Sequence, residues 1–306
     1  QTDLLYASSY DGDSNWIANV AADWTFVNDK GSFNASVNSV SAATSVTFNA
    51  DVTTVVADHA VIRASFGGDT DDTGTTIAGI EISAGAQATV RINDVSGSGG
   101  VAKETNNMTA DDSITLHGAA YDSDGNYISN PSGTWTFTND KGSFLPGSDD
   151  NSETGASVTF YANQATIAAD HCVINFSSGG DNDDTGTVNA GFEITAGALV
   201  NIRVESKSDG SGNVFTTGEY FNDVTSGTTM TLFSVGYDAD SNYKGTESAT
   251  WTFNSSGNQT SSNGVGTIVA GPAVSTTWTV LNVVGADAII ATAGAKSDDT
   301  GTMDVG

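Results

Sequence analysis

The sequence predicts an all-β protein in which one β-sandwich occurs three times in tandem. Three short motifs carry this prediction, because each occurs three times, in the same order and at nearly constant spacing. A repeat this regular indicates one structural unit used three times. The motifs are Trp-Thr-Phe, which begins at Trp24, Trp135 and Trp251; a Tyr-Asp-x-Asp-x-Asn turn, which begins at Tyr10, Tyr121 and Tyr237; and Asp-Asp-Thr-Gly, which begins at Asp71, Asp183 and Asp298.

Short strands are expected to fill each copy. In the second copy, residues 113–117 and 133–137 alternate in polarity, which is the period of a half-buried strand. Trp135 and Phe137 then share one face, so we expect this Trp to be a core residue. About seven such strands per hundred residues is typical of a Greek-key sandwich. The other strands expected in this copy cover residues 88–92, 156–160, 171–176 and 187–194.

Alignment of the copies predicts three domains, over residues 1–85, 86–197 and 198–306. The first domain lacks its first strand, because Thr2 aligns with Ser113 and the second copy has a strand before that point. The third domain stops within its last strand. A sandwich without one strand leaves an open edge that can pair with another chain. We expect either that a neighbouring subunit fills this edge, or that the chain is a fragment or misses a terminal segment.

The charge balance argues against two classes of partner. The chain carries 9 Lys and Arg against 37 Asp and Glu, for a formal net charge of −28. Nucleic acid and anionic membranes would repel such a surface, so we expect neither nucleic-acid binding nor membrane insertion. Hydrophobic residues still make up 38% of the chain, which is enough for several small cores. The single Cys172 lies in an apolar run and is predicted to be buried.

The turn and the strand that follows it resemble a known repeat. The second copy reads Tyr-Asp-Ser-Asp-Gly-Asn over residues 121–126 and Trp-Thr-Phe-Thr-Asn-Asp-Lys-Gly over residues 135–142. This pattern resembles the bacterial immunoglobulin-like repeats of invasin- and intimin-type adhesins and related surface proteins. The resemblance covers essentially the whole chain and implies tandem immunoglobulin-like Greek-key sandwiches at a cell surface. The third copy departs from it, because Asn-Ser-Ser-Gly replaces the Asn-Asp-Lys-Gly turn at residues 254–257.

Acidic side chains are expected to gather at one end of each sandwich, where the turn after the second strand, the last hairpin and the incoming linker meet. Clustered carboxylate and amide oxygens favour Ca²⁺, which would also stiffen the junctions between domains. The alternative is that Asp and Asn only close tight turns through hydrogen bonds to the backbone. The candidate ligands are Asp11, Asp13, Asn15, Asp69, Asp71 and Asp72 in the first copy; Asp122, Asp124, Asn126, Asp181, Asp183 and Asp184 in the second; and Asp238, Asp240, Asn242, Asp298 and Asp299 in the third.

Catalysis is not expected, because the paired carboxylates and the His59 and His171 positions recur between copies, whereas a catalytic site would be unique. The favoured function is that of an extracellular structural protein, the subunit of a surface filament, layer or stalk, whose partners are copies of itself. The alternative is an adhesin segment that binds a glycan or a host or matrix ligand through a patch that is not repeated. The candidates for such a patch are Trp16 and residues 213–223, with Phe215, Tyr220 and Phe221; Trp278 is a further candidate for stacking on a sugar.

Overall fold

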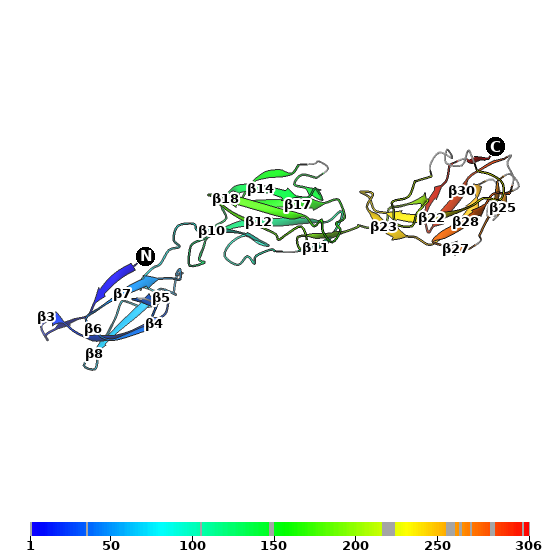
Figure 1. The fold of residues 1–306 in the computed structure, drawn as a ribbon. Coiled ribbons are helices and arrows are strands. Elements are labelled where there is room, and N and C mark those ends of the chain that lie inside the picture. Colours follow the sequence, from blue (N-terminus) through cyan, green and yellow to red (C-terminus); the bar gives the residue numbers. More distant parts are fainter. Residues whose placement is uncertain are drawn as a thin grey trace.

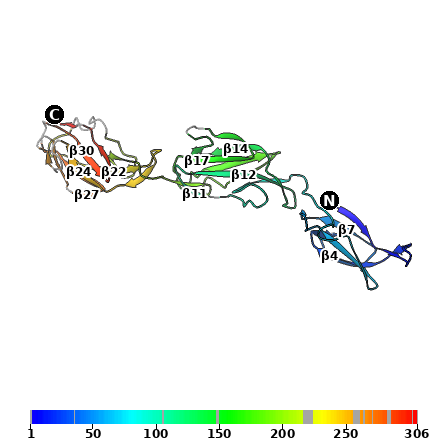
Figure 2. The ribbon, with the colours of Figure 1, turned by 180° about the vertical axis from the view of Figure 1, so that it is seen from behind.

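The chain is all-β, built from small and mainly antiparallel sheets, as expected for tandem immunoglobulin-like domains. The computed structural model describes residues 2–305 apart from 35, 105, 147–149, 216–223, 255–260, 263–264, 270, 282–284 and 302. Within these residues no helix is long and apolar enough to cross a membrane. The strands gather in three groups that follow one another along an extended chain (Figures 1 and 2). We call the predicted spans 1–85, 86–197 and 198–306 repeats 1, 2 and 3.

Repeat 1 pairs its strands in two larger sheets and one hairpin. The sheets have the orders β1-β7-β5 and β6-β4-β8-β9, and β2 pairs with β3. These pairings are antiparallel. The strands are β1 Thr2–Tyr6, β2 Ser8–Tyr10, β3 Trp16–Asn19, β4 Ala22–Asn28, β5 Gly31–Phe33, β6 Ser39–Ala43, β7 Ser45–Ala50, β8 Val61–Phe66 and β9 Asp69–Asp72.

Repeat 2 adds a strand at the start, β10, which pairs antiparallel with β12. The two larger sheets have the orders β10-β12-β17-β15, with β13 also on β12, and β16-β14-β18-β19. A short parallel pair, β11 and β20, accompanies them. The strands are β10 Thr89–Asn93, β11 Asn107–Thr109, β12 Ser113–Tyr121, β13 Tyr127–Ser129, β14 Gly133–Thr138, β15 Gly142–Ser143, β16 Ser152–Gly155, β17 Ser157–Ala162, β18 Val173–Ser178, β19 Asp181–Asp184 and β20 Glu193–Thr195.

Repeat 3 follows the same plan. Its larger sheets have the orders β21-β22-β28-β26-β25, with β23 also on β22, and β27-β24-β30-β31, and β29 pairs with β32. The strands are β21 Asn201–Glu205, β22 Thr229–Tyr237, β23 Tyr243–Thr246, β24 Ala249–Phe253, β25 Ser261–Ser262, β26 Gly266–Ile268, β27 Pro272–Ala273, β28 Ser275–Thr279, β29 Gly285–Asp287, β30 Ile289–Ala293, β31 Lys296–Asp299 and β32 Met303–Val305.

Each repeat has its own hydrophobic core with the motif Trp inside it, so the core assignment of Trp135 is confirmed. Each of these indoles also donates Nε1–H to a backbone carbonyl of the strand that pairs beside it. The distance from Nε1 to the oxygen is 3.0 Å for Trp135 and Gly155. Cys172 is buried as predicted, and burial raises the pKa of its thiol to about 12. It is a core residue and an unreactive thiol at neutral pH.

The core of repeat 2 depends on a glycine that faces a large ring. A Cβ on Gly118 would lie 2.2 Å from the ring of Phe176, and that ring packs on Trp135 with 4.4 Å between centroids. The position that aligns with Gly118 in repeat 1 is Ala7, and there Ala64 replaces the Phe opposite the motif Trp. The two positions therefore exchange volume between repeats, which is how a close-packed interior keeps its density.

We predict that Gly118→Ala destabilises repeat 2 by about 1–3 kcal/mol, because the added methyl group overpacks the core. The same change should cost much less in a Phe176→Ala background, which reproduces the pair of alanines found in repeat 1. Denaturant unfolding of the four variants in a double-mutant cycle measures the coupling. Equal costs in both backgrounds would show that the two positions do not share this space.

Candidate functional site at the repeat junctions

The Asp-x-Asp-x-Asn turn has the same internal hydrogen bonds in all three repeats. In repeat 2, the Asp122 carboxylate accepts backbone N–H groups from Asp124 at 3.0 Å and Asn126 at 2.8 Å. Equivalent bonds close the turns that begin at Asp11 and Asp238. The residue before the final Asn has positive φ each time, +82° at Gly125, where a glycine adopts this conformation without strain. Hydrogen bonds from the backbone to the first Asp side chain thus close each turn.

Asn126 joins repeat 2 to repeat 1. Its Oδ1 accepts the backbone N–H of Thr53 at 3.1 Å, and its Nδ2 donates to the carbonyl oxygen of Asp51 at 2.9 Å. Both partners lie in the loop that follows β7 of repeat 1. The amide is oriented by the same turn, because Nδ2 also donates to the Asp122 carboxylate at 3.0 Å. One side chain therefore satisfies a donor and an acceptor of the neighbouring repeat.

The junction between repeats 2 and 3 uses the same atoms. Asn242 accepts the N–H of Ala165 at 2.8 Å and donates to the carbonyl oxygen of Asn163 at 2.9 Å. Lys244 adds a hydrogen bond from Nζ to the carbonyl oxygen of Gly197 at 2.8 Å. At both junctions the Asn amide binds an N–H group and a carbonyl oxygen that lie two residues apart in the preceding repeat. This recurrence indicates a specific interface and not an accidental contact.

The linkers are held by the first Asp of each turn. The N–H of Gly85 donates to Asp122 Oδ2, and the N–H of Gly197 donates to Asp238 Oδ2, both at 2.8 Å. Burial at the junction opposes ionisation of Asp122 and Asp238, but the hydrogen bonds that they accept outweigh it and lower the pKa of both carboxyls. A lowered pKa means that these groups contribute stability above the ordinary pKa of Asp, which is lost as the pH falls through the lowered value.

The hairpin carboxylates do not join the turns in a common cluster, because they hold the first strand. In repeat 2, the N–H of Ile92 in β10 donates to Asp183 Oδ2 at 2.7 Å. In repeat 3, the N–H of Val204 in β21 donates to Asp298 Oδ2 at 2.6 Å. Burial raises the pKa of Asp183 and Asp298.

The remaining hairpin acids have local partners. Asp181 accepts a hydrogen bond from Gln87 at 2.9 Å. Asp72 forms an ion pair with Arg63, with Oδ1 2.7 Å from Nε. Asp184 and Asp299 accept the backbone N–H groups of Gly186 and Gly301 and so close the turn after the hairpin. Asp69 and Asp71 line an open groove, which is described below.

Calcium binding at these loops stays a prediction. In the described part of the chain, no three His, Cys, Asp or Glu side chains lie close enough to hold a metal ion. Asp122 and Asp238 are already satisfied by N–H donors, so a cation would have to share or displace them. The best candidate pair is Asp240 with Asp111 of repeat 2: burial first and then the negative charge of Asp111 raise the pKa of Asp240.

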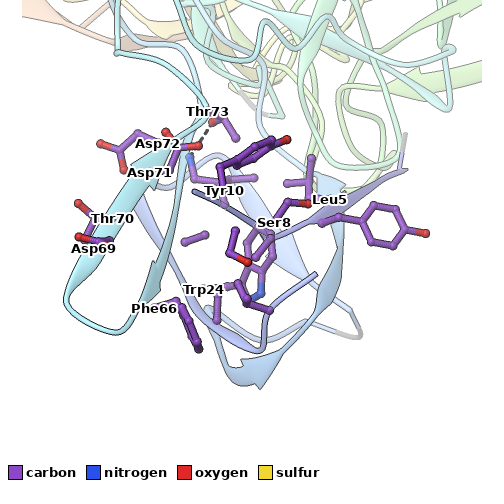
Figure 3. A pocket seen from close by; sticks show the side chains of 17 residues that line it. Leu5, Ser8, Tyr10, Trp24, Phe66, Asp69, Thr70, Asp71, Asp72 and Thr73 are labelled. Carbon is purple, nitrogen blue, oxygen red and sulfur yellow. Dashed lines mark hydrogen bonds between the residues drawn. The ribbon is translucent and has the colours of Figure 1, made fainter. Parts of the chain in front are cut away.

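Repeat 1 has a groove where repeats 2 and 3 carry their first strand. The groove encloses about 360 Å³ and lies between β1 and β2 on one side and β8 and β9 on the other. The exposed ring of Tyr10 and the buried indole of Trp24 both line it, with the carboxylates of β9 nearby (Figure 3). Tyr10 is 60% exposed, whereas its counterparts Tyr121 and Tyr237 are 7% and 4% exposed. The residues that line the groove include Leu5, Ala7, Val20, Ala22, Ile62, Ala64 and Phe66.

The residues proposed for ligand recognition differ in exposure: Trp16 lies on the surface, whereas Trp278 and Phe215 are buried. Trp16 is 61% exposed and pairs with Tyr10 across the β2–β3 hairpin. Tyr127 and Tyr243 occupy this position in the other repeats, so an aromatic residue recurs here although the Trp does not. Trp278 and Phe215 are buried in the core of repeat 3, which corrects their candidacy for ligand contact. Tyr220 and Phe221 lie outside the described residues.

Sequence reasoning missed the bridging role of Asn126 and Asn242 and the anchoring role of Asp183 and Asp298. A usable signal was present, because Gly-Ala precedes the first strand at residues 85–86 and again at 197–198. In each case the Gly lies seven residues before the apolar residue whose N–H binds the hairpin Asp. With that spacing, one segment bonds to the turn through its Gly and to the hairpin through its apolar residue.

Comparison with known proteins returned likenesses of structure alone. No family model and no curated sequence matches the chain. The Escherichia coli adhesin FdeC is 15% identical, with 97% of this chain and 89% of that chain covered and a TM-score of 0.39. Yersinia pseudotuberculosis InvD is 16% identical, with 100% and 92% covered and a TM-score of 0.39. Domains 5–6 of the S-layer protein SbsC are 16% identical, with 72% and 96% covered and a TM-score of 0.23.

We predict that Asn126→Ala loosens the first junction, because two cross-junction hydrogen bonds are lost, each contributing roughly 0.5–1.5 kcal/mol. Small-angle X-ray scattering should show a broader distribution of distances between repeats 1 and 2. Asn15→Ala is the matched control, since Asn15 closes the same turn in repeat 1 and, among the described residues, its side chain bonds within its own turn. Identical scattering from both variants would mean that Asn126 does not hold the joint.

We predict that Asp240→Asn stabilises the second junction at neutral pH. The folded-state pKa of Asp240 is raised, so the folded chain binds more protons than the unfolded chain between the ordinary and the raised pKa, and stability falls as the pH rises through this window. The thermal midpoint of repeat 3 should therefore rise at pH 7 and change little near pH 3. A lower midpoint at pH 7 would contradict the assigned repulsion from Asp111.

Proposed function

We propose that the chain is a non-enzymatic extracellular structural protein made of three tandem immunoglobulin-like Greek-key sandwiches, which span residues 1–85, 86–197 and 198–306. In this role it forms the stiff repeating material of a surface filament, layer or stalk and assembles with copies of itself. The observation that carries the proposal is the joint itself: the same Asp and Asn atoms connect repeat 1 to repeat 2 and repeat 2 to repeat 3.

Stiffness at the junctions is what a mechanical role requires. Tandem domains are expected to move relative to one another unless their interface resists it. Here each junction has the two hydrogen bonds of its Asn side chain and a linker glycine tied to the turn of the following repeat, and Lys244 adds a further bond at the second. The linker cannot swing away without losing that bond. These constraints support a rod whose bending is limited at both joints.

The charge supports an exposed and extended particle. A net charge of −28 repels other parts of the same rod and other rods, which keeps the chain soluble and limits non-specific association. Assembly then needs a specific contact. The groove of repeat 1 is the best candidate for it, because it combines apolar side chains with an unpaired strand edge. Calcium at the junctions would add stiffness, and it is the part of this proposal that a chelator tests directly.

Recognition of a glycan or another cell-surface ligand is the second candidate function, favoured by the exposed pair of Tyr10 and Trp16. Flat aromatic rings on a hairpin can stack on a sugar. In this case Trp16→Ala should abolish binding in a glycan array or cell-binding assay, whereas Tyr243→Ala, at the matched position of repeat 3, should leave it unchanged.

We predict that the purified chain forms ordered polymers or lattices in negative-stain electron microscopy, with a matching high-mass species in size-exclusion chromatography. Calcium and a chelator are compared in the same samples and in thermal melting. A stable monomer that never forms ordered assemblies would refute the structural role as a homopolymer. Identical melting in calcium and chelator would reject the cation.

A further inference from the structure

We propose that the groove of repeat 1 is a binding site for a β-strand of defined sequence, Gly-Ala followed by three variable residues and then (Val/Ile)-Arg-(Ile/Val). This inference deepens the proposed assembly role and rests on it. It names the ligand by chemistry: an extended peptide with two apolar side chains two residues apart and an Arg between them.

Repeats 2 and 3 show how such a strand is held at both ends. At the start, the Gly N–H donates to the first Asp of the turn, 2.8 Å from Asp122 and from Asp238. Seven residues later, the N–H of the second apolar residue donates to the hairpin Asp, at 2.7 Å in repeat 2 and 2.6 Å in repeat 3. The two carboxylates therefore bind backbone N–H groups that lie seven residues apart in the segment.

The side chains between these anchors also match. Val90 and Ile92 are buried in the core of repeat 2, and Ile202 and Val204 are buried in that of repeat 3. The Arg between each pair turns the other way and stacks on the turn Tyr. The guanidinium carbon of Arg91 lies 4.7 Å from the ring centroid of Tyr121. For Arg203 and Tyr237 the distance is 4.3 Å. Such a cation–π contact favours Arg at this position.

Repeat 1 has the same turn Asp, turn Tyr and hairpin Asp, but among the described residues no first strand contacts them. Asp11 matches Asp122, Tyr10 matches Tyr121, and Asp71 matches Asp183. Asp11 already lies in the same turn geometry, closed by Asn15. Tyr10 and Asp71 both line the groove (Figure 3). The high exposure of Tyr10 is what a ring without its Arg would show.

The backbone edge is also prepared. In repeat 2, β10 pairs with residues 117–121 of β12, and β17 and β13 pair with β12 along its other edge. The aligned segment of repeat 1 is residues 6–10, where β7 and β3 take the corresponding other edge. An incoming strand would thus run antiparallel to β2. Its Arg would enter a region with Asp69 and Asp71, which supplies charge complementarity.

The test uses the full chain and a fluorescein-labelled synthetic peptide with the sequence of residues 196–206, Ala-Gly-Ala-Leu-Val-Asn-Ile-Arg-Val-Glu-Ser. Fluorescence anisotropy should show saturable binding. Tyr10→Ala and Asp71→Asn in the protein should each weaken it by at least tenfold. Asp29→Asn is the control, because it makes the same change in an exposed turn of repeat 1 that lies outside the groove lining, and it should leave the affinity unchanged.

Changes in the peptide keep the test independent of protein folding. Replacement at the positions of the source residues, Arg203→Ala or Val204→Asp, should reduce binding at least tenfold, and a scrambled peptide should not bind. Absence of saturable binding, or binding that ignores Tyr10→Ala and Asp71→Asn, overturns the proposal. The outcome is separate from that of the assembly experiment: peptide binding without polymers removes the homopolymer role and leaves this site, and polymers without peptide binding do the reverse.

Discussion

The arrangement of the repeats depends on one interaction, the acceptance of several N–H groups by the first carboxylate of the Asp-x-Asp-x-Asn turn. In repeat 2, this carboxylate closes the turn, holds the linker through Gly85 and orients the amide of Asn126 toward repeat 1. Without it the Asn would be free to rotate and the linker would lose its anchor. A single ionised group thus couples local turn geometry to the relation between neighbouring repeats.

Many of the Asp carboxylates that give the chain its negative charge form structural hydrogen bonds. Asp carboxylates carry out three tasks: they close turns, tie down linkers and hold the first strand through Asp183 and Asp298. All three use the carboxylate as an acceptor of backbone N–H groups, an interaction that is stronger with a charged acceptor than with a neutral one. Calcium binding at these acidic segments stays a proposal. Protonation at low pH destabilises the joint at Asp122, whose pKa is lowered in the folded chain. At Asp183, whose pKa is raised, protonation instead removes the cost of burying a charge.

Repeat 1 lacks the first strand that β10 and β21 supply in repeats 2 and 3. It has the same turn, the same motif Trp and the same hairpin, but Tyr10 and the groove beside it are open. Because the partners that hold a first strand are all in place, the groove is selective in a way that a plain apolar surface is not. Its two carboxylates select the spacing of two backbone N–H groups in the strand. Its apolar lining selects the two apolar side chains, and the ring of Tyr10 selects the Arg between them. The strands that complete repeats 2 and 3 are thus the kind of strand that we propose for the groove of repeat 1.

Most strands of repeat 2, the threefold repeat and the buried positions of Trp135 and Cys172 followed from the sequence, because they depend on periodicity and on motif spacing that are local in the chain. The strand expected over residues 187–194 is wrong: only its end lies in a strand, β20 (Glu193–Thr195), and the acidic segment Asp181–Asp184 before it forms β19 instead. The sequence could not show that Asn126 binds Asp51 and Thr53, or that Asp183 holds β10, since these partners are about 75 and 91 residues apart. It likewise left open whether Trp278 is exposed. Those outcomes were decided by which loops and edges the folded sandwiches bring together, and a hydrogen bond of about 3 Å can be assigned only once that packing is in place.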